Sequence, residues 1–107
     1  MSETIQEIDA TTFDATIAGP GVAVVDFWAP WCGPCRAMAP VFADAAASLA
    51  GQARFGKVNV DKSPALAARL GIRSIPTIIV FRDGQPVETL VGVQSPGAFL
   101  GAVRRHL

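Results

Sequence analysis

The sequence contains few of the residues that bind metals or form stabilising disulfides. Its 107 residues include two cysteines, Cys32 and Cys35, and one histidine, His106. A structural zinc site takes about four nitrogen or sulfur ligands, so these residues give no basis for a metal site. Half of the residues are apolar, which is enough to fill one core without such cross-links. We therefore expect a single domain spanning residues 1–107, with no bound metal or cofactor.

An excess of charge of one sign is also missing. Nine basic residues balance nine acidic ones, and the longest basic cluster is the pair Arg104-Arg105. Two adjacent arginines are too few to neutralise the run of phosphates that a nucleic-acid-binding protein contacts. We therefore do not expect nucleic acid as a partner.

Long apolar runs and the pattern of an export signal are missing as well. Runs such as Val22 to Val25 and Ile78 to Phe81 are far shorter than the roughly 20 residues that span a bilayer. Residues 2–9 are polar and acidic, whereas a signal peptide has a basic start and an apolar middle. We expect a soluble cytoplasmic protein without a membrane partner.

The apolar pattern predicts an α/β protein. Val22 to Trp28 is apolar on both alternating faces, which is typical of a central strand, and Asp26 is its single polar residue. Apolar residues at steps of three or four predict a helix from Pro34 to near Gly51, kinked but not ended by Pro40. We also expect a helix from Thr11 or Thr12 to Ala18, a strand over Arg54 to Val60, a helix over Pro64 to Leu70, a hairpin of strands Thr77 to Phe81 and Val87 to Val91 joined at Asp83-Gly84, and a last helix opened by Ser95-Pro96. These elements predict a mixed sheet with helices on both faces.

The two cysteines stand where the central strand gives way to the helix. Residues three apart at a helix start have Cβ atoms about 5 to 6 Å apart, and a small backbone adjustment brings them into disulfide range. A loop this short would gain only about 2 kcal/mol from a structural disulfide. The spacing therefore favours a bond that opens and closes over one that serves as a staple.

Their position also predicts different roles for the two thiols. Cys32 would lie at the helix N-terminus, where free backbone amides and the helix dipole favour a negative charge. A free thiol is about 3% ionised at pH 7, and stabilisation by about 2 kcal/mol would make it roughly half ionised. We expect Cys32 to attack and Cys35, one turn inside the helix, to resolve the mixed disulfide.

Other interpretations of the pair are weaker. A zinc site would lack ligands, and haem attachment would need a histidine directly after Cys35, where Arg36 stands. Two inert buried thiols are a minor alternative, because chance seldom places two cysteines at this spacing on a helix start. The residues thus favour dithiol/disulfide redox chemistry.

The segment Trp28 to Cys35, WAPWCGPC, resembles the active-site segment of the thioredoxin family. The similarity extends over essentially the whole chain, through Asp26, Pro40, Lys57, Asp61, Ile75-Pro76-Thr77, Gly84 and Gly92. It implies the thioredoxin fold, a central five-stranded mixed β-sheet flanked by four α-helices. It also implies a monomeric protein-disulfide reductase that contributes to cell redox homeostasis, acts on disulfide-containing proteins and is reduced by an NADPH-dependent flavoprotein, thioredoxin reductase.

The resemblance assigns further site residues. A charged carboxylate inside an apolar strand costs several kcal/mol, so the sequence alone leaves Asp26 either buried or wetted at a strand end. The resemblance implies that Asp26 is buried behind Cys35 and helps to move its proton, with Lys57 nearby. It also implies a flat apolar rim around Cys32 that binds substrate. We call this set the rim: Trp31, Gly33, Pro34, Ile75, Pro76, Val91 and Gly92.

Some features of the rim stay open at this stage. Only about 5 to 6% of X–Pro bonds in folded proteins are cis, so sequence alone does not decide the Ile75–Pro76 bond, whereas the resemblance implies a cis bond facing the cysteines. Ile75 and Val91 could instead be core residues, and Trp28 would be core in either interpretation. His106 is expected to be a tail residue without a role.

The dipeptide Gly33-Pro34 resembles that of reducing family members, whereas a histidine before the second cysteine would resemble isomerases or oxidases. Two departures from the family pattern, Arg36 for lysine and Ser74 for glycine, leave substrate preference open. A binding module that keeps the fold without turnover, and an oxidase or isomerase, are the alternatives to a reductase.

Overall fold

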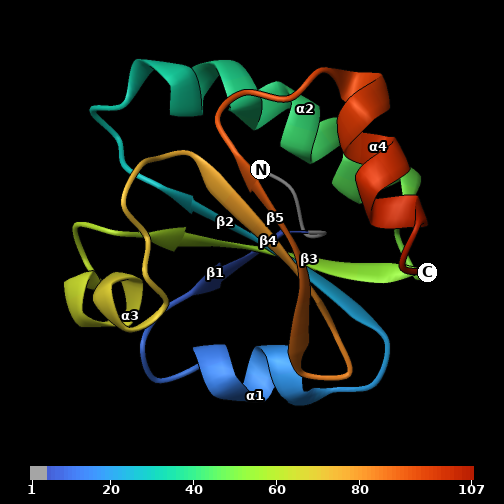
Figure 1. Cartoon of the computed structure of the whole chain (residues 1–107), viewed down its shortest axis with the longest axis horizontal. Coiled ribbons are helices and arrows are strands. Elements are labelled where there is room, and N and C mark those ends of the chain that lie inside the picture. Colours follow the sequence, from blue (N-terminus) through green and yellow to red (C-terminus); the bar gives the residue numbers. More distant parts are fainter. Residues whose placement is uncertain (1–4) are drawn as a thin grey trace.

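A central mixed sheet organises the chain in the computed structural model, which describes residues 5–107 (Figure 1). The strands there are β1 (Ile5–Ile8), β2 (Val22–Trp28), β3 (Ala53–Asn59), β4 (Thr77–Arg82) and β5 (Gln85–Val91), and the helices are α1 (Phe13–Ala18), α2 (Gly33–Ser48), α3 (Pro64–Arg69) and α4 (Pro96–Arg104). The strands lie in the order β1-β3-β2-β4-β5. The first three are parallel, and β4 and β5 are antiparallel to their neighbours. This confirms the predicted five-stranded mixed sheet with four helices.

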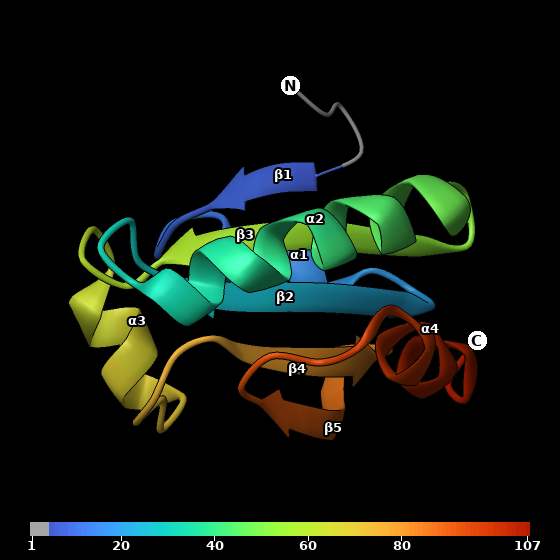
Figure 2. The same ribbon diagram turned by 90° about the horizontal axis from the view of Figure 1, so that it is seen from above.

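The helices cover the two faces of the sheet in pairs. Figure 1 shows α2 and α4 above the sheet and α1 and α3 below it, and Figure 2 shows α2 lying along β2 and β3. The core is accordingly divided into two layers. The upper layer includes Val24, Phe42 and Phe99, and the lower layer includes Phe13, Val25 and Phe27. Successive residues of β2 alternate between these layers, as expected for a strand that is covered on both sides.

The helices and strands that the apolar pattern predicts are present, and their ends differ from the prediction by a few residues. The helix α2 continues through Pro40, but it begins at Gly33 and ends at Ser48 rather than near Gly51. The turn after it uses Gly51 with a φ of +83°, a left-handed conformation that side chains disfavour. The helix therefore stops before the glycine because its chain must reverse into β3.

The hairpin between β4 and β5 forms where Asp83-Gly84 predicts it. Asp83 and Gly84 have φ values of +51° and +85°, and two positive φ values in sequence are the signature of the tight turn that suits a hairpin. The Asp83 carboxylate accepts a hydrogen bond from the Gly21 N–H at 2.7 Å. This contact joins the hairpin to the turn before β2.

The N-terminal part of the fold differs from the expectation in two ways. The apolar pattern did not predict strand β1, which pairs in parallel with β3 at the sheet edge. In addition, Thr12 occupies the expected N-cap position of α1, but its side chain accepts no capping hydrogen bond. The Asp9 carboxylate accepts hydrogen bonds from the backbone N–H groups of Thr11 at 2.9 Å and Thr12 at 3.1 Å, in the turn that leads into the helix. A carboxylate is an equally good acceptor at a helix start.

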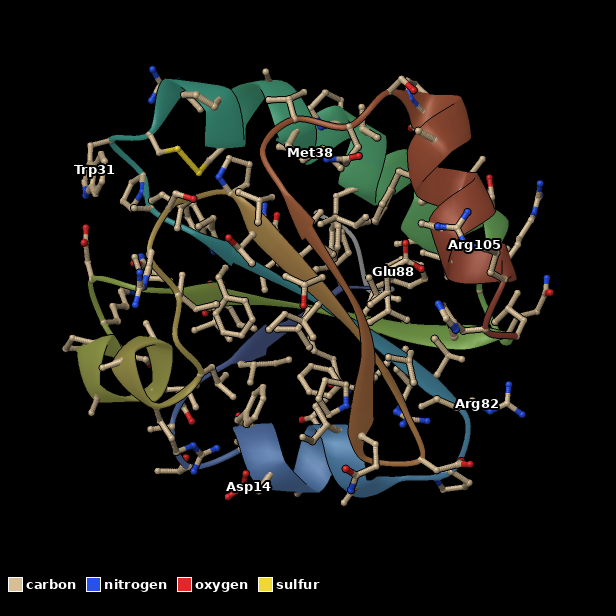
Figure 3. The ribbon with its side chains drawn as sticks, viewed as in Figure 1. Asp14, Trp31, Met38, Arg82, Glu88 and Arg105 are labelled. Atoms are coloured by element: carbon tan, nitrogen blue, oxygen red, sulfur yellow. A yellow bond between two sulfur atoms is a disulfide. The ribbon has the colours of Figure 1, made fainter. Side chains whose placement is uncertain are left out.

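The C-terminus is held by charged contacts, and His106 is not a free tail residue. Its imidazole Nε2 lies 2.7 Å from a Glu88 carboxylate oxygen, and Arg105 lies 2.5 Å from the other oxygen. Figure 3 shows Glu88 and Arg105 side by side, between β5 and the end of α4. These hydrogen bonds lower the pKa of Glu88 below its usual range. They fasten the end of the chain to the edge strand.

Two expectations concern membranes and export. Within residues 5–107, every helix is too short or too polar to cross a bilayer. Residues 2–4, which contribute to the expectation that no export signal is present, lie outside the described residues.

Candidate active site

The two cysteines are joined by a disulfide at the start of α2. Their Cα atoms are 5.2 Å apart, within the range that a disulfide allows. Figure 3 shows the sulfur–sulfur bond at the first turn of α2, close to Trp31. The spacing that favoured a redox pair in the sequence thus brings the two sulfurs together.

Cys32 occupies the N-cap position of α2. Its backbone is extended, and its Sγ accepts a hydrogen bond from the Cys35 N–H at 3.1 Å. This amide is one of the four at a helix start that have no partner within the helix. The sulfur of Cys32 therefore lies where the helix offers it an N–H donor and the positive end of its dipole.

Solvent exposure hardly distinguishes the two sulfurs in the disulfide. Cys32 is 5% exposed and Cys35 3% exposed, so both cysteines are buried to nearly the same degree. Their surroundings differ more. Cys35 belongs to the buried stripe of α2 that also carries Met38 and Phe42, whereas Cys32 precedes the helix. Helix position, rather than exposure, separates the two thiols.

Asp26 lies on the face of the sheet that α2 covers. It is 0% exposed, which contradicts the alternative of a strand-end residue wetted by solvent. Its neighbour on the same face of β2, Val24, packs in the upper core layer with residues of α2. Because side chains alternate along a strand, Asp26 points the same way. The buried stripe of α2, which begins at Cys35, faces this side of the sheet.

The carboxyl group of Asp26 has no compensating hydrogen bond from any residue in 5–107. Burial therefore raises its pKa from 3.8 to about 6, although the nearby Lys57 ammonium lowers it. Lys57 is paired with Asp26 in the register of β2 and β3, and its Nζ lies 4.8 Å from the centre of the Trp28 ring. A carboxyl with a pKa near neutrality can take up and release a proton under cellular conditions.

The loop before β4 faces the disulfide. The Ile75–Pro76 bond is cis, in agreement with the resemblance, and the Ile75 carbonyl oxygen lies 3.8 Å from Cys32 Sγ. The Pro76 carbonyl accepts a hydrogen bond from the Gly92 N–H at 2.9 Å. Gly92 has a φ of +87°, which a residue with a side chain adopts only with strain. These contacts connect the cysteines, the Ile75–Pro76 bond and the end of β5.

The residues of the rim differ in exposure. Trp31 is 67% exposed and Val91 60% exposed, so Val91 is not a core residue. Gly33 and Pro34 are also exposed, Ile75 and Gly92 are half-buried, and Pro76 is buried. Trp28, expected in the core, is half-buried. The surface around Cys32 is thus apolar and partly open.

The fold also forms side-chain contacts around this surface that the sequence did not predict. The Trp31 indole N–H donates to the Asp61 carboxylate at 2.9 Å, and Arg36 donates to the Pro30 carbonyl at 3.0 Å. Val93 is 50% exposed beyond Gly92. The two hydrogen bonds could not be predicted because they join residues that only the fold brings together. Val93, by contrast, is an apolar residue in a loop, and the sequence alone could have identified it as a candidate surface residue.

Within residues 5–107, no three histidine, cysteine, aspartate or glutamate side chains are grouped so that they could hold a metal ion.

Comparison with known proteins agrees with this geometry. The sequence model of the Thioredoxin family matches residues 4–105. The chain is 42% identical to Thioredoxin 1 of Synechococcus elongatus over 107 residues, which is 100% of both chains. It is 44% identical to Thioredoxin of Staphylococcus aureus over 103 residues, covering 96% of this chain and 98% of the relative. Among solved structures, Malassezia sympodialis thioredoxin (Mala s 13) superposes with a TM-score of 0.87 at 38% identity, covering 95% of this chain and 90% of the other.

Thioredoxins are disulfide oxidoreductases that exchange disulfides with protein substrates, are reduced by a thioredoxin reductase and contribute to cell redox homeostasis. The cysteine pair in this chain is joined in the way such exchange requires. From the fold, the cysteine pair and the full-length matches, we conclude that the chain belongs to the thioredoxin family.

Proposed function

We propose that this oxidoreductase works in the reducing direction, with Cys32 as the attacking thiolate and Cys35 as the resolving thiol. The Cys32 thiolate attacks one sulfur of a protein disulfide, and the other sulfur leaves as a thiolate that takes up a proton. Cys35 then loses its proton and attacks the Cys32 sulfur, so the second substrate thiolate leaves. Two electrons pass to the substrate, and the Cys32–Cys35 disulfide remains.

One observation carries this assignment of roles. Cys32 Sγ sits at the N-cap of α2 and accepts the Cys35 N–H at 3.1 Å. When the disulfide is reduced, the same donor and the helix dipole favour a thiolate at Cys32. Cys35 lies within the first turn and lacks that advantage. The first attack therefore belongs to Cys32.

Asp26 is proposed as the base that takes the proton from Cys35, through a water molecule. Its carboxyl is buried on the face that α2 covers, and burial raises its pKa to about 6. At neutral pH such a carboxyl is mostly ionised and can accept a proton, and it is more basic than an ordinary aspartate. Lys57 is the cation that favours the ionised form of Asp26, because its charge lowers the carboxyl pKa.

The rim is proposed to bind the substrate around the attacked disulfide. Trp31 and Val91 offer exposed apolar surface, and Gly33 and Pro34 lie open beside Cys32. The Ile75 backbone, 3.8 Å from Cys32 Sγ, is placed to pair with an extended substrate strand, and Pro76 and Gly92 support it. A shallow groove of 320 Å³ runs between Trp31 and Ile75. A flat apolar surface of this kind suits many partners.

We further propose that the chain functions in the cytoplasm as a monomer and as one domain. Its reductant would be an NADPH-dependent thioredoxin reductase. The full-length similarity of the chain to thioredoxins supports these assignments.

The equilibrium reduction potential tests the direction. Thioredoxins lie at about −270 mV, disulfide isomerases at about −180 mV and the oxidase DsbA at about −120 mV. We expect this chain within about 30 mV of the thioredoxin value. The measurement is equilibration with glutathione buffers, followed by alkylation and mass spectrometry of Cys32 and Cys35. A value near −180 mV or higher would favour the isomerase or oxidase alternative.

A further inference from the structure

Met38 connects the active-site helix to the loop that follows β5. It lies on α2, one turn after Cys35, and is fully buried. Its Sδ accepts a hydrogen bond from the backbone N–H of Gln94 at 3.4 Å. Figure 3 shows Met38 beneath α2, beside the segment that leads from β5 to α4. We call this segment, residues 92–95, the β5–α4 loop.

The β5–α4 loop continues directly from the rim residue Val91. The side-chain amide of Gln94 donates to the carbonyls of Val91 at 3.3 Å and Gly92 at 3.2 Å, and the Gly92 N–H donates to the Pro76 carbonyl at 2.9 Å. Gln94 therefore gathers the loop into one unit. That unit is fastened to the Ile75–Pro76 segment on one side and, through Met38, to α2 on the other.

The sulfur atom is what makes the second attachment possible. A thioether is a weak acceptor, whereas the aliphatic side chains of leucine, isoleucine and valine offer no acceptor at all. Leucine or isoleucine would fill the same volume and leave the Gln94 N–H without a partner, which is unfavourable for a partly buried donor. An outward movement of the loop would then be favourable, because the Gln94 N–H could form a hydrogen bond with water.

We propose that Met38 is a positioning residue, whose thioether fixes the position of the rim residues Val91 and Gly92 relative to Cys32. The role rests on the proposed function, because it matters only if the rim binds substrate. Met38 packs in the upper core layer and not in the cluster that contains Cys32 and Cys35. It acts through Gln94, and its effect belongs to the docking of protein substrates rather than to the exchange of sulfurs.

Replacement of methionine by norleucine tests this directly, because it exchanges the sulfur for a methylene group at nearly constant shape. Norleucine also replaces Met1, so a Met38→Leu protein prepared with and without norleucine shows the effect of Met1 alone. Selenomethionine, which keeps a chalcogen acceptor, serves as the conservative rescue. The probes are insulin, as a protein disulfide, and the small aromatic disulfide DTNB.

In the norleucine protein we expect hydrogen exchange of the Gln94 amide to accelerate about 10-fold. We expect KM for insulin to rise about three-fold with kcat unchanged, the pattern of lost substrate binding. The rate with DTNB, which needs no rim, should stay the same, and the selenomethionine protein should behave like the parent. A purely structural role would move the rates with both disulfides together.

Two results would overturn the inference. Unchanged exchange at Gln94 would mean that the sulfur does not hold the loop. Faster exchange at Gln94 with an unchanged KM for insulin would mean that the loop is held but does not position the rim. Failure of the proposed function is a separate result, since it would appear as an unmodified protein that does not reduce insulin.

Discussion

Replacement of Cys32 by serine will abolish the reduction of protein disulfides, whereas replacement of Cys35 will stop the reaction at its first covalent step. Serine has no sulfur to exchange, and its hydroxyl is not ionised at neutral pH, so we expect turnover to fall by at least about 10³-fold. The measurement is insulin reduction coupled to NADPH oxidation by thioredoxin reductase. A protein that acts only as a binding module would keep its function in the Cys32→Ser variant.

The Cys35→Ser variant is the matched control, because it removes the same atom from the other side of the disulfide. We expect it to attack insulin once and remain bound as a mixed disulfide, which mass spectrometry detects as an insulin chain on Cys32. The same variant can capture substrates from a cell extract. If Cys32→Ser formed the stable adduct and Cys35→Ser did not, the two roles would have to be exchanged.

Replacement of Asp26 by asparagine will stabilise the protein by an amount that depends on pH. Burial raises the pKa of Asp26 from 3.8 to about 6, and a rise of that size is worth about 3 kcal/mol. Below pH 3.8 the carboxyl is protonated in both the folded and the unfolded chain, so it contributes no pH-dependent term. Between 3.8 and about 6 only the unfolded chain loses the proton, and folding becomes less favourable. Above about 6 the loss stays constant.

The quantity to measure is the free energy of unfolding in urea for the parent and the Asp26→Asn variant, both oxidised, at pH 3 and pH 8. We expect the difference between variant and parent to be about 3 kcal/mol larger at pH 8. The free-energy cost of burying the asparagine amide cancels from this comparison, because it is the same at pH 3 and pH 8. Lys57→Met is the control, since loss of its cation should move the Asp26 transition to a higher pH. An equal difference at pH 3 and pH 8 would show that the carboxyl is not buried in its charged form.

The same variant tests the role of Asp26 in proton transfer. Without a base near Cys35, resolution of the mixed disulfide should slow by about 10²-fold near neutral pH. Single-turnover kinetics across a range of pH would show the loss of the transition that belongs to Asp26. A reduction rate that matches the parent at every pH would leave Asp26 with an effect on stability alone.

Much of this fold could be predicted because its strongest signals are local. The run Val22–Trp28 marked the central strand, Asp83-Gly84 marked the hairpin, and the apolar stripe marked α2. Strand β1 gave no such signal because it lies at the sheet edge, where Gln6 and Glu7 are exposed. An edge strand with polar residues does not show the alternation that identifies a half-buried strand.

The candidate site also has features that the sequence predicts and features that it does not. The positions of the cysteines followed from spacing, and the roles of Asp26 and the rim were suggested by family resemblance. The contacts of Trp31 with Asp61 and of Met38 with Gln94 could not be predicted, because 30 and 56 residues separate the partners. The hydrogen bonds of Asp9 to the backbone before α1 were also missed, since threonine and aspartate are comparable acceptors at a helix start and only geometry chooses between them.

The proposed roles of the two cysteines depend on the ionisation of Cys32 near neutral pH. In reduced Cys35→Ser protein, Cys32 is the single thiol, so the rate of its alkylation by iodoacetamide reports its thiolate fraction at each pH. We expect the rate to reach half its maximum at least one pH unit below a free cysteine, whose pKa is about 8.5. A titration that coincides with that of a cysteine peptide measured in parallel would show that the helix start does not activate Cys32, and Cys32 could not then be the attacking thiolate.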